Sequence, residues 1–203
     1  MQTIETAGVR MPHLKFDIAK IERLDDEGRF DDLDPGVMWE ALGCPSPRVI
    51  VDIGAGTGLF ARRFAGMAPG ATVFAVDTVP EMLRWIEEHP DPAVGRRIKP
   101  VLAQESHVPL PDANADLAVM INLHHELADP DASYRDAGRL LCPGGQMLVV
   151  DWAIGNKEGG PPQRVRAAPE RIVAILETAG FVDVAVHTRL RRHWLITARK
   201  SVS

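Results

Sequence analysis

The sequence predicts an α/β protein with an open, doubly wound sheet of seven strands, in three layers with helices on both faces. Short and nearly continuous apolar runs alternate with helical stretches, as they do where crossover helices join buried parallel strands. The last two runs are separated only by the segment 188–192. This separation leaves no room for a crossover helix, and it predicts an antiparallel hairpin after five parallel strands.

Each element follows from its composition and its end signals. Strands are expected over 48–53, 72–77, 97–102, 115–121, 146–152, 181–187 and 193–199. Helices are expected over 59–67, 80–88, 131–141 and 169–179. Pro80 suits the first turn of its helix, and Gly180 follows the last helix at a position that often takes a left-handed conformation.

Length and composition are those of an ordinary globular chain. With 203 residues, 45% of them hydrophobic and 25% charged, the chain can bury one full core. We therefore expect a single domain, 1–203, in which a helical extension, 1–44, precedes a core, 45–203. The net charge of −5 makes a nucleic-acid partner unexpected. Cys44 and Cys142 predict neither a metal site nor a disulfide.

Targeting and assembly signals are sparse. The first residues lack the apolar run of a signal peptide, and no segment approaches the ~20 apolar residues of a membrane span. A cytoplasmic protein without a membrane partner is therefore expected. The tryptophans are scattered along the chain and identify no subunit interface, so the oligomeric state stays open.

A glycine-rich loop follows the first predicted strand. Gly54, Gly56 and Gly58 would let the backbone turn tightly and approach a ligand at the carboxyl edge of the sheet. The dinucleotide pattern needs a small residue where the chain has Leu59, and no lysine stands where a Walker A loop needs one. The loop therefore disfavours both a dinucleotide-binding site and a Walker A phosphate site. An NAD-dependent oxidoreductase is kept only as an alternative.

Two acidic residues accompany this loop. Asp52 precedes it on the first strand, and Asp77 ends the second strand. A carboxylate at the position of Asp77 can accept hydrogen bonds from both hydroxyls of a ribose that carries no 2′-phosphate. An adenosine-containing ligand is therefore expected.

Four segments carry a resemblance to a known family. In order, they are VDIGAGTG, VFAVDTVPEML, VPLPDANADLAVMINLHH and RDAGRLLCPGGQMLVVDW. Together they resemble the motifs of class I S-adenosylmethionine-dependent methyltransferases, above all the bacterial group with ubiquinone/menaquinone-type and arsenite-type enzymes. The resemblance covers roughly 45–199. It implies a Rossmann-like sheet with an antiparallel seventh strand, S-adenosyl-L-methionine as cofactor and S-adenosyl-L-homocysteine as product.

The resemblance also implies roles for individual residues. Asp52 and the glycine loop would hold the methionine end of the cofactor, the acid binding its ammonium and backbone groups its carboxylate. Asp77 would bind the ribose, and Met82 would pack on the adenine. The implied cofactor-binding residues are Asp52, Gly54, Ala55, Gly56, Gly58, Asp77, Thr78, Met82, Gln104, Glu105 and Asn122. At Gln104 and Glu105 the chain departs from the family's usual Asp and small residue, so either side chain could accept from the adenine amino group.

Two histidines follow the fourth strand, where the resemblance implies that the methyl group points. Methyl transfer is an in-line displacement, so the protein has mainly to align the reactants and exclude water. If the acceptor loses a proton, His124 or His125 could be the catalytic base, and on an extended segment only one of them would face the pocket. Their spacing does not match a metal site, so no metal is expected, although Asp151 keeps a metal-dependent alternative open.

The methyl acceptor is expected to be a small molecule of unknown identity. An apolar stripe predicts that the extension forms a lid: Phe16, Ile18, Ile21 and Leu24. The acidic residues between 25 and 34 are expected to form a solvated face. On an extended segment, Arg164 and Arg166 could both point toward an anionic acceptor. The predicted function is methyl transfer from S-adenosylmethionine to this acceptor, and the alternative is a non-catalytic protein that only binds the cofactor.

Overall fold

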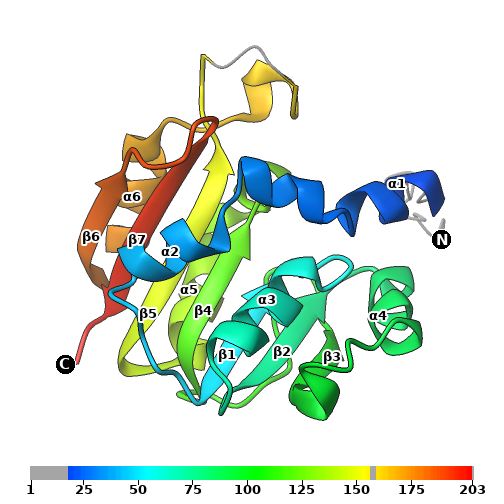
Figure 1. The fold of residues 1–203 in the computed structure, drawn as a ribbon. Coiled ribbons are helices and arrows are strands. Elements are labelled where there is room, and N and C mark those ends of the chain that lie inside the picture. The colour runs from blue at the N-terminus through cyan, green and yellow to red at the C-terminus, as the bar shows by residue number, and fades with distance from the viewer. Residues whose placement is uncertain (1–17, 156–158, 203) are drawn as a thin grey trace, which may run out of the picture.

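The computed structural model describes residues 18–155 and 159–202 (Figure 1). Within these residues the strands are β1 (Val49–Ile53), β2 (Thr72–Asp77), β3 (Ile98–Leu102), β4 (Ala115–Ile121), β5 (Leu141–Trp152), β6 (Phe181–His187) and β7 (His193–Lys200). They form one sheet in the order β3-β2-β1-β4-β5-β7-β6. Strands β1 to β5 are parallel, and β7 runs antiparallel to both β5 and β6. The predicted seven-stranded sheet with a C-terminal hairpin is confirmed.

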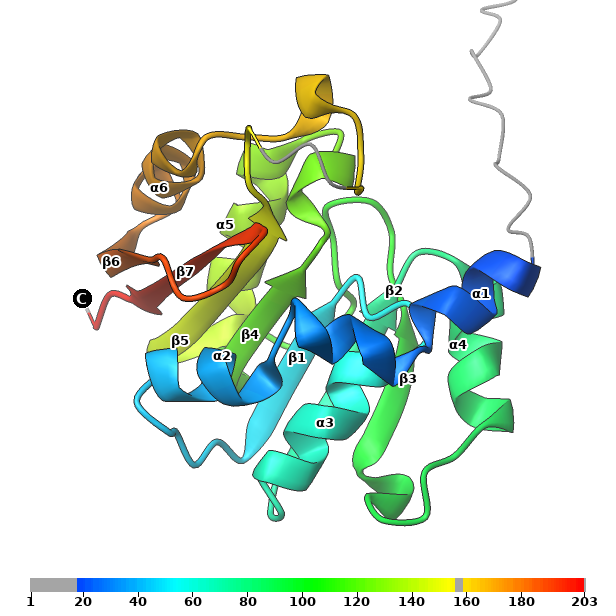
Figure 2. The ribbon, with the colours of Figure 1, turned by 45° about the horizontal axis from the view of Figure 1, so that its top comes forward.

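Helices cover both faces of the sheet (Figures 1 and 2). They include α3 (Leu59–Met67), α4 (Pro80–Glu88), α5 (Pro130–Leu140) and α6 (Pro169–Thr178). Neighbouring residues of a strand point to opposite faces, so the buried side chains divide into two cores. Ile50 and Val119 belong to the core that contains α3 and α4 residues, while Val51 and Met120 belong to the core of α5 and α6. None of the helices in the described ranges is long and apolar enough to cross a bilayer.

Strand β5 is longer than its apolar pattern predicts. It begins at Leu141, whereas the prediction begins at 146. Leu141 pairs with Ala115 of β4, and the register then shifts before Leu117 pairs with Gln146. The segment between contains a proline and two glycines, which read as a turn in the sequence but here form an irregular part of the strand.

The strand order reverses between β1 and β4. The chain moves outward from β1 through β2 to β3 and then returns to place β4 on the other side of β1. Ile53 pairs with both Val76 of β2 and Met120 of β4, so the carboxyl ends of these three strands meet. Open α/β sheets bind ligands at such a switch point.

The N-terminal segment, here residues 18–42, crosses this edge of the sheet (Figures 1 and 2). It contains α1 (Ile18–Leu24), η1 (Glu27–Asp31) and α2 (Pro35–Ala41). Of the predicted apolar stripe, Ile21 is buried and Leu24 half-buried, whereas Phe16 lies outside the described residues.

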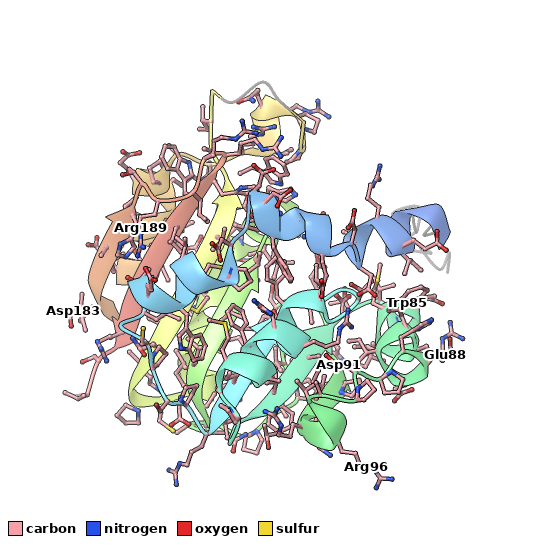
Figure 3. All side chains as sticks on the ribbon, viewed as in Figure 1. Trp85, Glu88, Asp91, Arg96, Asp183 and Arg189 are labelled. Atoms are coloured by element: carbon pink, nitrogen blue, oxygen red, sulfur yellow. The ribbon has the colours of Figure 1, made fainter. Side chains whose placement is uncertain are left out.

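Four of the six acidic residues between 25 and 34 are exposed, as expected of a solvated face: Asp26, Glu27, Asp31 and Asp34. Asp25 and Asp32 are half-buried, and they form ion pairs with Arg62 of α3 and with Arg192 next to β7, respectively. Asp26 and Asp34 accept hydrogen bonds from backbone amides and cap η1 and α2. Farther along, Glu40 pairs with Arg189 in the β6–β7 turn, which lies over α2 (Figure 3). The paired acids therefore fasten the segment to α3 and to the hairpin, a long-range pairing that charge pattern alone could not predict.

Candidate functional site

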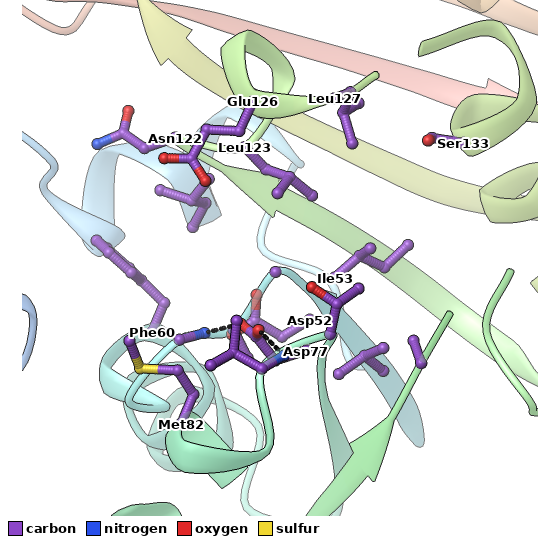
Figure 4. Close-up of a pocket in the computed structure, with 18 of the residues that line it drawn as sticks. Asp52, Ile53, Phe60, Asp77, Met82, Asn122, Leu123, Glu126, Leu127 and Ser133 are labelled. Atoms are coloured by element: carbon purple, nitrogen blue, oxygen red, sulfur yellow. Dashed lines mark hydrogen bonds between the residues drawn. The ribbon is translucent and has the colours of Figure 1, made fainter. Parts of the chain in front are cut away.

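A cavity of about 890 Å³ opens at the carboxyl edge of the sheet (Figure 4). Its walls come from the ends of β1, β2 and β4, from the loops that follow β1 to β4, from the N-terminal segment and from residues around Trp152 and Pro161 after β5. Every residue of the implied cofactor set lines it except Gly58, which instead precedes α3 as its N-cap. The structure thus brings nearly all of that set to one place.

Asp52 is buried in the wall of the cavity. Its side chain is 2% exposed, and its Oδ2 atom has no hydrogen-bond partner within the described residues. Burial, with the nearby charge of Asp77, raises the pKa of Asp52 to about 7, and the positive charge of Arg29 opposes this rise. A backbone hydrogen bond from Ala61 also opposes the rise. A buried carboxylate oxygen without a partner is costly, so Oδ2 favours a cationic or hydrogen-donating ligand.

The glycine loop lies beside Asp52, and its glycines are needed for different reasons. At Gly54, φ is +75°, and a Cβ would lie 2.7 Å from Cδ1 of Leu123, so a side chain here would collide with the loop after β4. At Gly56, φ is +55°, and a Cβ would meet nothing within 4 Å. Gly56 lines the cavity, so its missing side chain leaves open space for a ligand.

Four amide groups of this loop already donate hydrogen bonds within the protein. The amides of Gly54 and Ala55 donate to the carbonyl of Val76 at 2.8 and 2.9 Å. The amide of Gly56 donates to Oδ2 of Asp77 at 2.8 Å. The amide of Gly58 donates to the carbonyl of Ala55 at 2.9 Å. The loop is therefore fixed by internal hydrogen bonds that occupy four of the five amides expected to hold a ligand carboxylate.

Asp77 has two functions in the structure. Its Oδ2 holds Gly56, and its Oδ1 accepts from the amide of Val79 at 2.9 Å, which fixes the start of α4. Burial raises the pKa of Asp77, and these backbone hydrogen bonds oppose the rise. Each carboxylate oxygen can accept more than one hydrogen bond, so the cavity-facing carboxylate can still receive two hydroxyl groups.

Next to Asp77 the cavity is partly apolar and ends at a tight turn. Met82 in α4 is 2% exposed and lines the wall. Gln104 and His107 exchange two backbone hydrogen bonds at 3.1 Å, and this turn presents Gln104, Glu105 and Ser106 to the cavity. The sequence departure at Gln104 and Glu105 therefore lies at the rim of the same cavity.

Asn122 stands where β4 gives way to its loop. Its φ of +55° is unusual for a residue other than glycine, and its amide donates to the carbonyl of Val150 at 2.7 Å. The Oδ1 atom is buried and has no partner in the described part of the chain. Asn122 and Glu126 project toward the cavity opposite Asp52 and Asp77 (Figure 4).

The two histidines face different surroundings. They lie in a 3-10 turn, η3 (His124–Glu126), and not on the extended segment expected. His125 lines the cavity, whereas His124 does not and instead meets the hydroxyl of buried Tyr134 at 3.1 Å. Burial lowers the pKa of His124. The structure therefore does not bring His124 to the cavity, and the proposed base is reduced to His125.

His125 is paired with the buried carboxylate of Asp151. Its Nδ1 lies 3.0 and 3.1 Å from the two carboxylate oxygens, and its backbone amide lies 3.3 Å from Oδ2. Since a carboxylate only accepts, the proton of a neutral imidazole belongs on Nδ1, and Nε2 keeps its lone pair. Nε2 has the exposed carboxylate of Glu126 at 3.6 Å.

The predicted arginine pair is not brought together. Arg164 is exposed in η4 (Gln163–Val165) and does not line the cavity. Arg166 is buried and donates to the carbonyls of Pro161, Ala153 and Gly159. Its guanidinium lies 5.2 Å from the ring centre of Trp152. The expected extended segment contains a 3-10 turn, so Arg166 holds the loop after β5 in place and does not face an acceptor.

Three residues of the N-terminal segment line the cavity and were not predicted as site residues. They are Arg23, Leu24 and Arg29. Arg29 stands within an acidic stretch, and no local pattern distinguishes it. No cluster of three or more His, Cys, Asp or Glu side chains that could hold a metal ion occurs in the described ranges.

Comparisons with known proteins agree with this geometry. A family model described as a methyltransferase domain matches residues 51–149. The chain is 37% identical over 120 residues to the ubiquinone/menaquinone biosynthesis C-methyltransferase UbiE of Caulobacter vibrioides, covering 54% of this chain and 46% of that protein. It is 34% identical over 106 residues to the malonyl-[acyl-carrier protein] O-methyltransferase of Hahella chejuensis, covering 52% and 36%. The chain thus spans about half, or less, of the length of these curated relatives.

Solved structures extend the similarity to nearly the whole chain. An S-adenosylmethionine-dependent methyltransferase from Aquifex aeolicus superposes with a TM-score of 0.83 at 26% identity, covering 91% of this chain and 99% of that one. Human N-acetylserotonin methyltransferase, solved with S-adenosylmethionine, has a TM-score of 0.71 at 20% identity over 89% of this chain and 55% of that one. The second likeness supports the fold alone.

Proposed function

We propose, on the premise that this chain belongs to the class I S-adenosylmethionine-dependent methyltransferases, that it transfers a methyl group to a small-molecule acceptor. One observation carries the proposal. Asp52 and Asp77, at or near the carboxyl ends of neighbouring strands, face one cavity of about 890 Å³ at the switch point of the sheet. S-Adenosylmethionine, when bound, supplies the methyl group from its sulfonium centre.

The side chains present fit this cofactor. Its methionine end carries an ammonium group, and Asp52 offers a buried carboxylate oxygen without a partner. Its ribose carries two free hydroxyls, and Asp77 offers a carboxylate that still has accepting capacity. At Gly56 the missing side chain leaves room in the cavity. A donor set of two acids and an open loop thus suits a cationic nucleoside.

We assign the remaining cofactor contacts by position. Met82 supplies an apolar surface for the adenine ring, and the turn with Gln104 and Glu105 supplies acceptors for its amino group. The unpartnered Oδ1 of Asn122 is available to a donor on the methionine end. We call the part of the cavity formed by Asp52, Gly56, Asp77 and Met82 the cofactor half.

We call the opposite part, formed by His125, Glu126, Trp152 and Pro161, the acceptor half. His125 is assigned as the base that takes a proton from the acceptor, at Nε2, while Asp151 holds Nδ1 and stabilises the imidazolium. The N-terminal segment acts as a lid that closes the cavity and excludes water from the transfer.

The size of the cavity favours a small acceptor. A volume of about 890 Å³ lies in the range of small-molecule sites, roughly 300–1,000 Å³, and it must hold both reactants. The N-terminal segment, fastened across the carboxyl edge by Asp25 and Asp32, limits access by a folded macromolecule.

Calorimetric titration tests the proposal. Purified protein is titrated with S-adenosylmethionine, S-adenosylhomocysteine and NAD. We expect micromolar binding of the first two, and an at least tenfold loss in Asp77→Asn, because one ribose acceptor becomes an amide donor. Glu88→Gln, an exposed change in α4, is the matched control and should bind as the wild type does (Figure 3). Binding of NAD alone would contradict the methyltransferase assignment.

A further inference from the structure

The methionine end of the proposed cofactor carries a carboxylate as well as an ammonium group, and the loop offers little to the carboxylate. The amides of residues 54, 55, 56 and 58 already donate to Val76, Asp77 and Ala55. Asp52 has a carboxylate oxygen without a hydrogen-bond partner, but its negative charge would repel the ligand's carboxylate. Beyond the amides at Thr57 and the start of α3, a positive group in the wall would bind this carboxylate through charge-assisted hydrogen bonds.

Arg29 supplies such a group from the N-terminal segment. Its Nη1 donates to the carbonyl of Leu24 at 2.7 Å, and its guanidinium lies 5.3 Å from the ring centre of Phe60. The carbonyl is neutral, and no carboxylate of the described ranges lies within ion-pair distance of Arg29. A guanidinium has five N–H donors in a planar fork that matches a carboxylate, so most of its capacity remains unused.

The surroundings of Arg29 place it close to Asp52. Burial lowers the pKa of Arg29, and among the nearby acids Asp52 has the largest opposing effect. The positive charge of Arg29 in turn acts to lower the pKa of Asp52. Both residues line the same cavity, together with Phe60 at the start of α3. The wall thus presents an acid and a guanidinium whose charges act on each other, which suits a group that carries an ammonium and a carboxylate on one carbon.

Arg29 is also held in position. Its amide donates to the carbonyl of Asp26 at 3.1 Å, and the side chain of Asp26 caps the same turn by accepting from Gly28. The neighbouring Asp25 pairs with Arg62, which also donates to the carbonyl of Thr57 in the glycine loop. A fixed cation loses little conformational entropy when it binds a ligand.

We propose that Arg29 binds the carboxylate of the methionine moiety, while Asp52 binds its ammonium group, so that the N-terminal segment takes part in cofactor recognition. The inference rests on the proposed cofactor, and it replaces the expectation that loop amides alone hold the carboxylate.

The test compares two ligands that differ in the amino-acid moiety. S-Adenosylhomocysteine has it, and 5′-methylthioadenosine lacks it. Calorimetric affinities are measured for the wild type, Arg29→Met, Arg29→Lys and Arg96→Met. We expect Arg29→Met to weaken S-adenosylhomocysteine binding at least tenfold and to change methylthioadenosine binding less than twofold, with partial recovery in Arg29→Lys. Arg96→Met removes an exposed arginine that does not line the cavity, and it should leave both affinities unchanged.

Three results would overturn the inference. Equal weakening of both ligands in Arg29→Met would mean that Arg29 only supports the lid. Unchanged affinities would leave the carboxylate to the amides at the start of α3. Equal wild-type affinity for the two ligands would show that the amino-acid moiety is not recognised, although the adenosine site stands. Failure of the wild type to bind either ligand would instead contradict the proposed function itself.

Discussion

The cofactor half and the acceptor half of the cavity are built in different ways. In the cofactor half, Asp52, Gly56 and Asp77 come from two consecutive strands and the loop between them, and hydrogen bonds tie Gly56 to Asp77. In the acceptor half, His125 comes from η3, which follows β4, and Trp152 is the last residue of β5. Each is held by a distant partner: His125 by Asp151, and Trp152 by the loop that carries Gly160 and Arg166. The residues of the cofactor half lie in neighbouring segments of the sequence. The residues of the acceptor half are positioned by tertiary contacts with residues far away in the sequence.

The largest expected effect tests the chemistry of the acceptor half. Once an acceptor has been identified, His125→Gln should lower kcat/KM by about 10²–10⁴, because glutamine can keep a hydrogen bond to Asp151 but cannot take up a proton. His107→Gln, another histidine in the cavity wall, is the control and should change it little. Unchanged kcat/KM across pH in His125→Gln would rule out a histidine base.

The close approach between the glycine loop and the loop after β4 is tested by Gly54→Ala. We expect a loss of about 2–4 kcal/mol in the free energy of unfolding, because the left-handed backbone and the collision with Leu123 add together. Urea denaturation measures it. Gly66→Ala is the control, since Gly66 lies in α3 with nothing near its missing Cβ, and alanine there should stabilise by about 0.5–1 kcal/mol. Equal stability of the two variants would show that the close approach is absent in solution.

A smaller effect concerns the charge of the cofactor half. The pKa of Asp52 is raised to about 7, so below that pH the side chain holds a proton that the ligand's ammonium group must displace. The affinity for S-adenosylhomocysteine should therefore rise between pH 5 and 7, by at most about tenfold per unit, and then level off. Titrations in buffers of different ionisation enthalpy should show proton release at pH 6, and Asp52→Asn should abolish it. A flat affinity over this range would contradict the assignment of Asp52.

The same raised pKa has a defined consequence for stability without ligand. A carboxyl whose folded pKa exceeds its unfolded value binds more protons in the folded state, so the free energy of unfolding falls as pH rises through that window. Asp52 thus lowers the stability of the ligand-free protein near neutral pH, and Asp52→Asn should be the more stable variant there.

Much of the fold and most of the cofactor half could be predicted from sequence, because both depend on short-range patterns. Helices α3 and α4 match their predicted bounds, since apolar spacing and proline fix them locally. The cofactor-binding roles remain proposals. Gly58 lies at the start of α3 outside the cavity wall, a difference that spacing does not reveal.

The acceptor half could not be predicted to the same degree. His124 and His125 share one 3-10 turn, which gives their side chains different surroundings. A second 3-10 turn contains Arg164 and ends before Arg166, so these two side chains do not point the same way. On the cofactor side, Arg29 was missed for a related reason: the N-terminal segment that carries it is fastened by Asp25 and Asp32, whose partners lie far along the chain. Local patterns cannot identify such partners, because the contacts depend on tertiary structure.

The ion pair between Asp32 and Arg192 also bears on the order in which the protein is made. Arg192 lies in the turn before β7, whereas Asp32 precedes β1, so strands β1 to β6 lie between them in the sequence. During synthesis this ion pair can form only after these strands have been made, long after the glycine loop. The glycine loop is therefore available before the N-terminal segment can be fastened at this point.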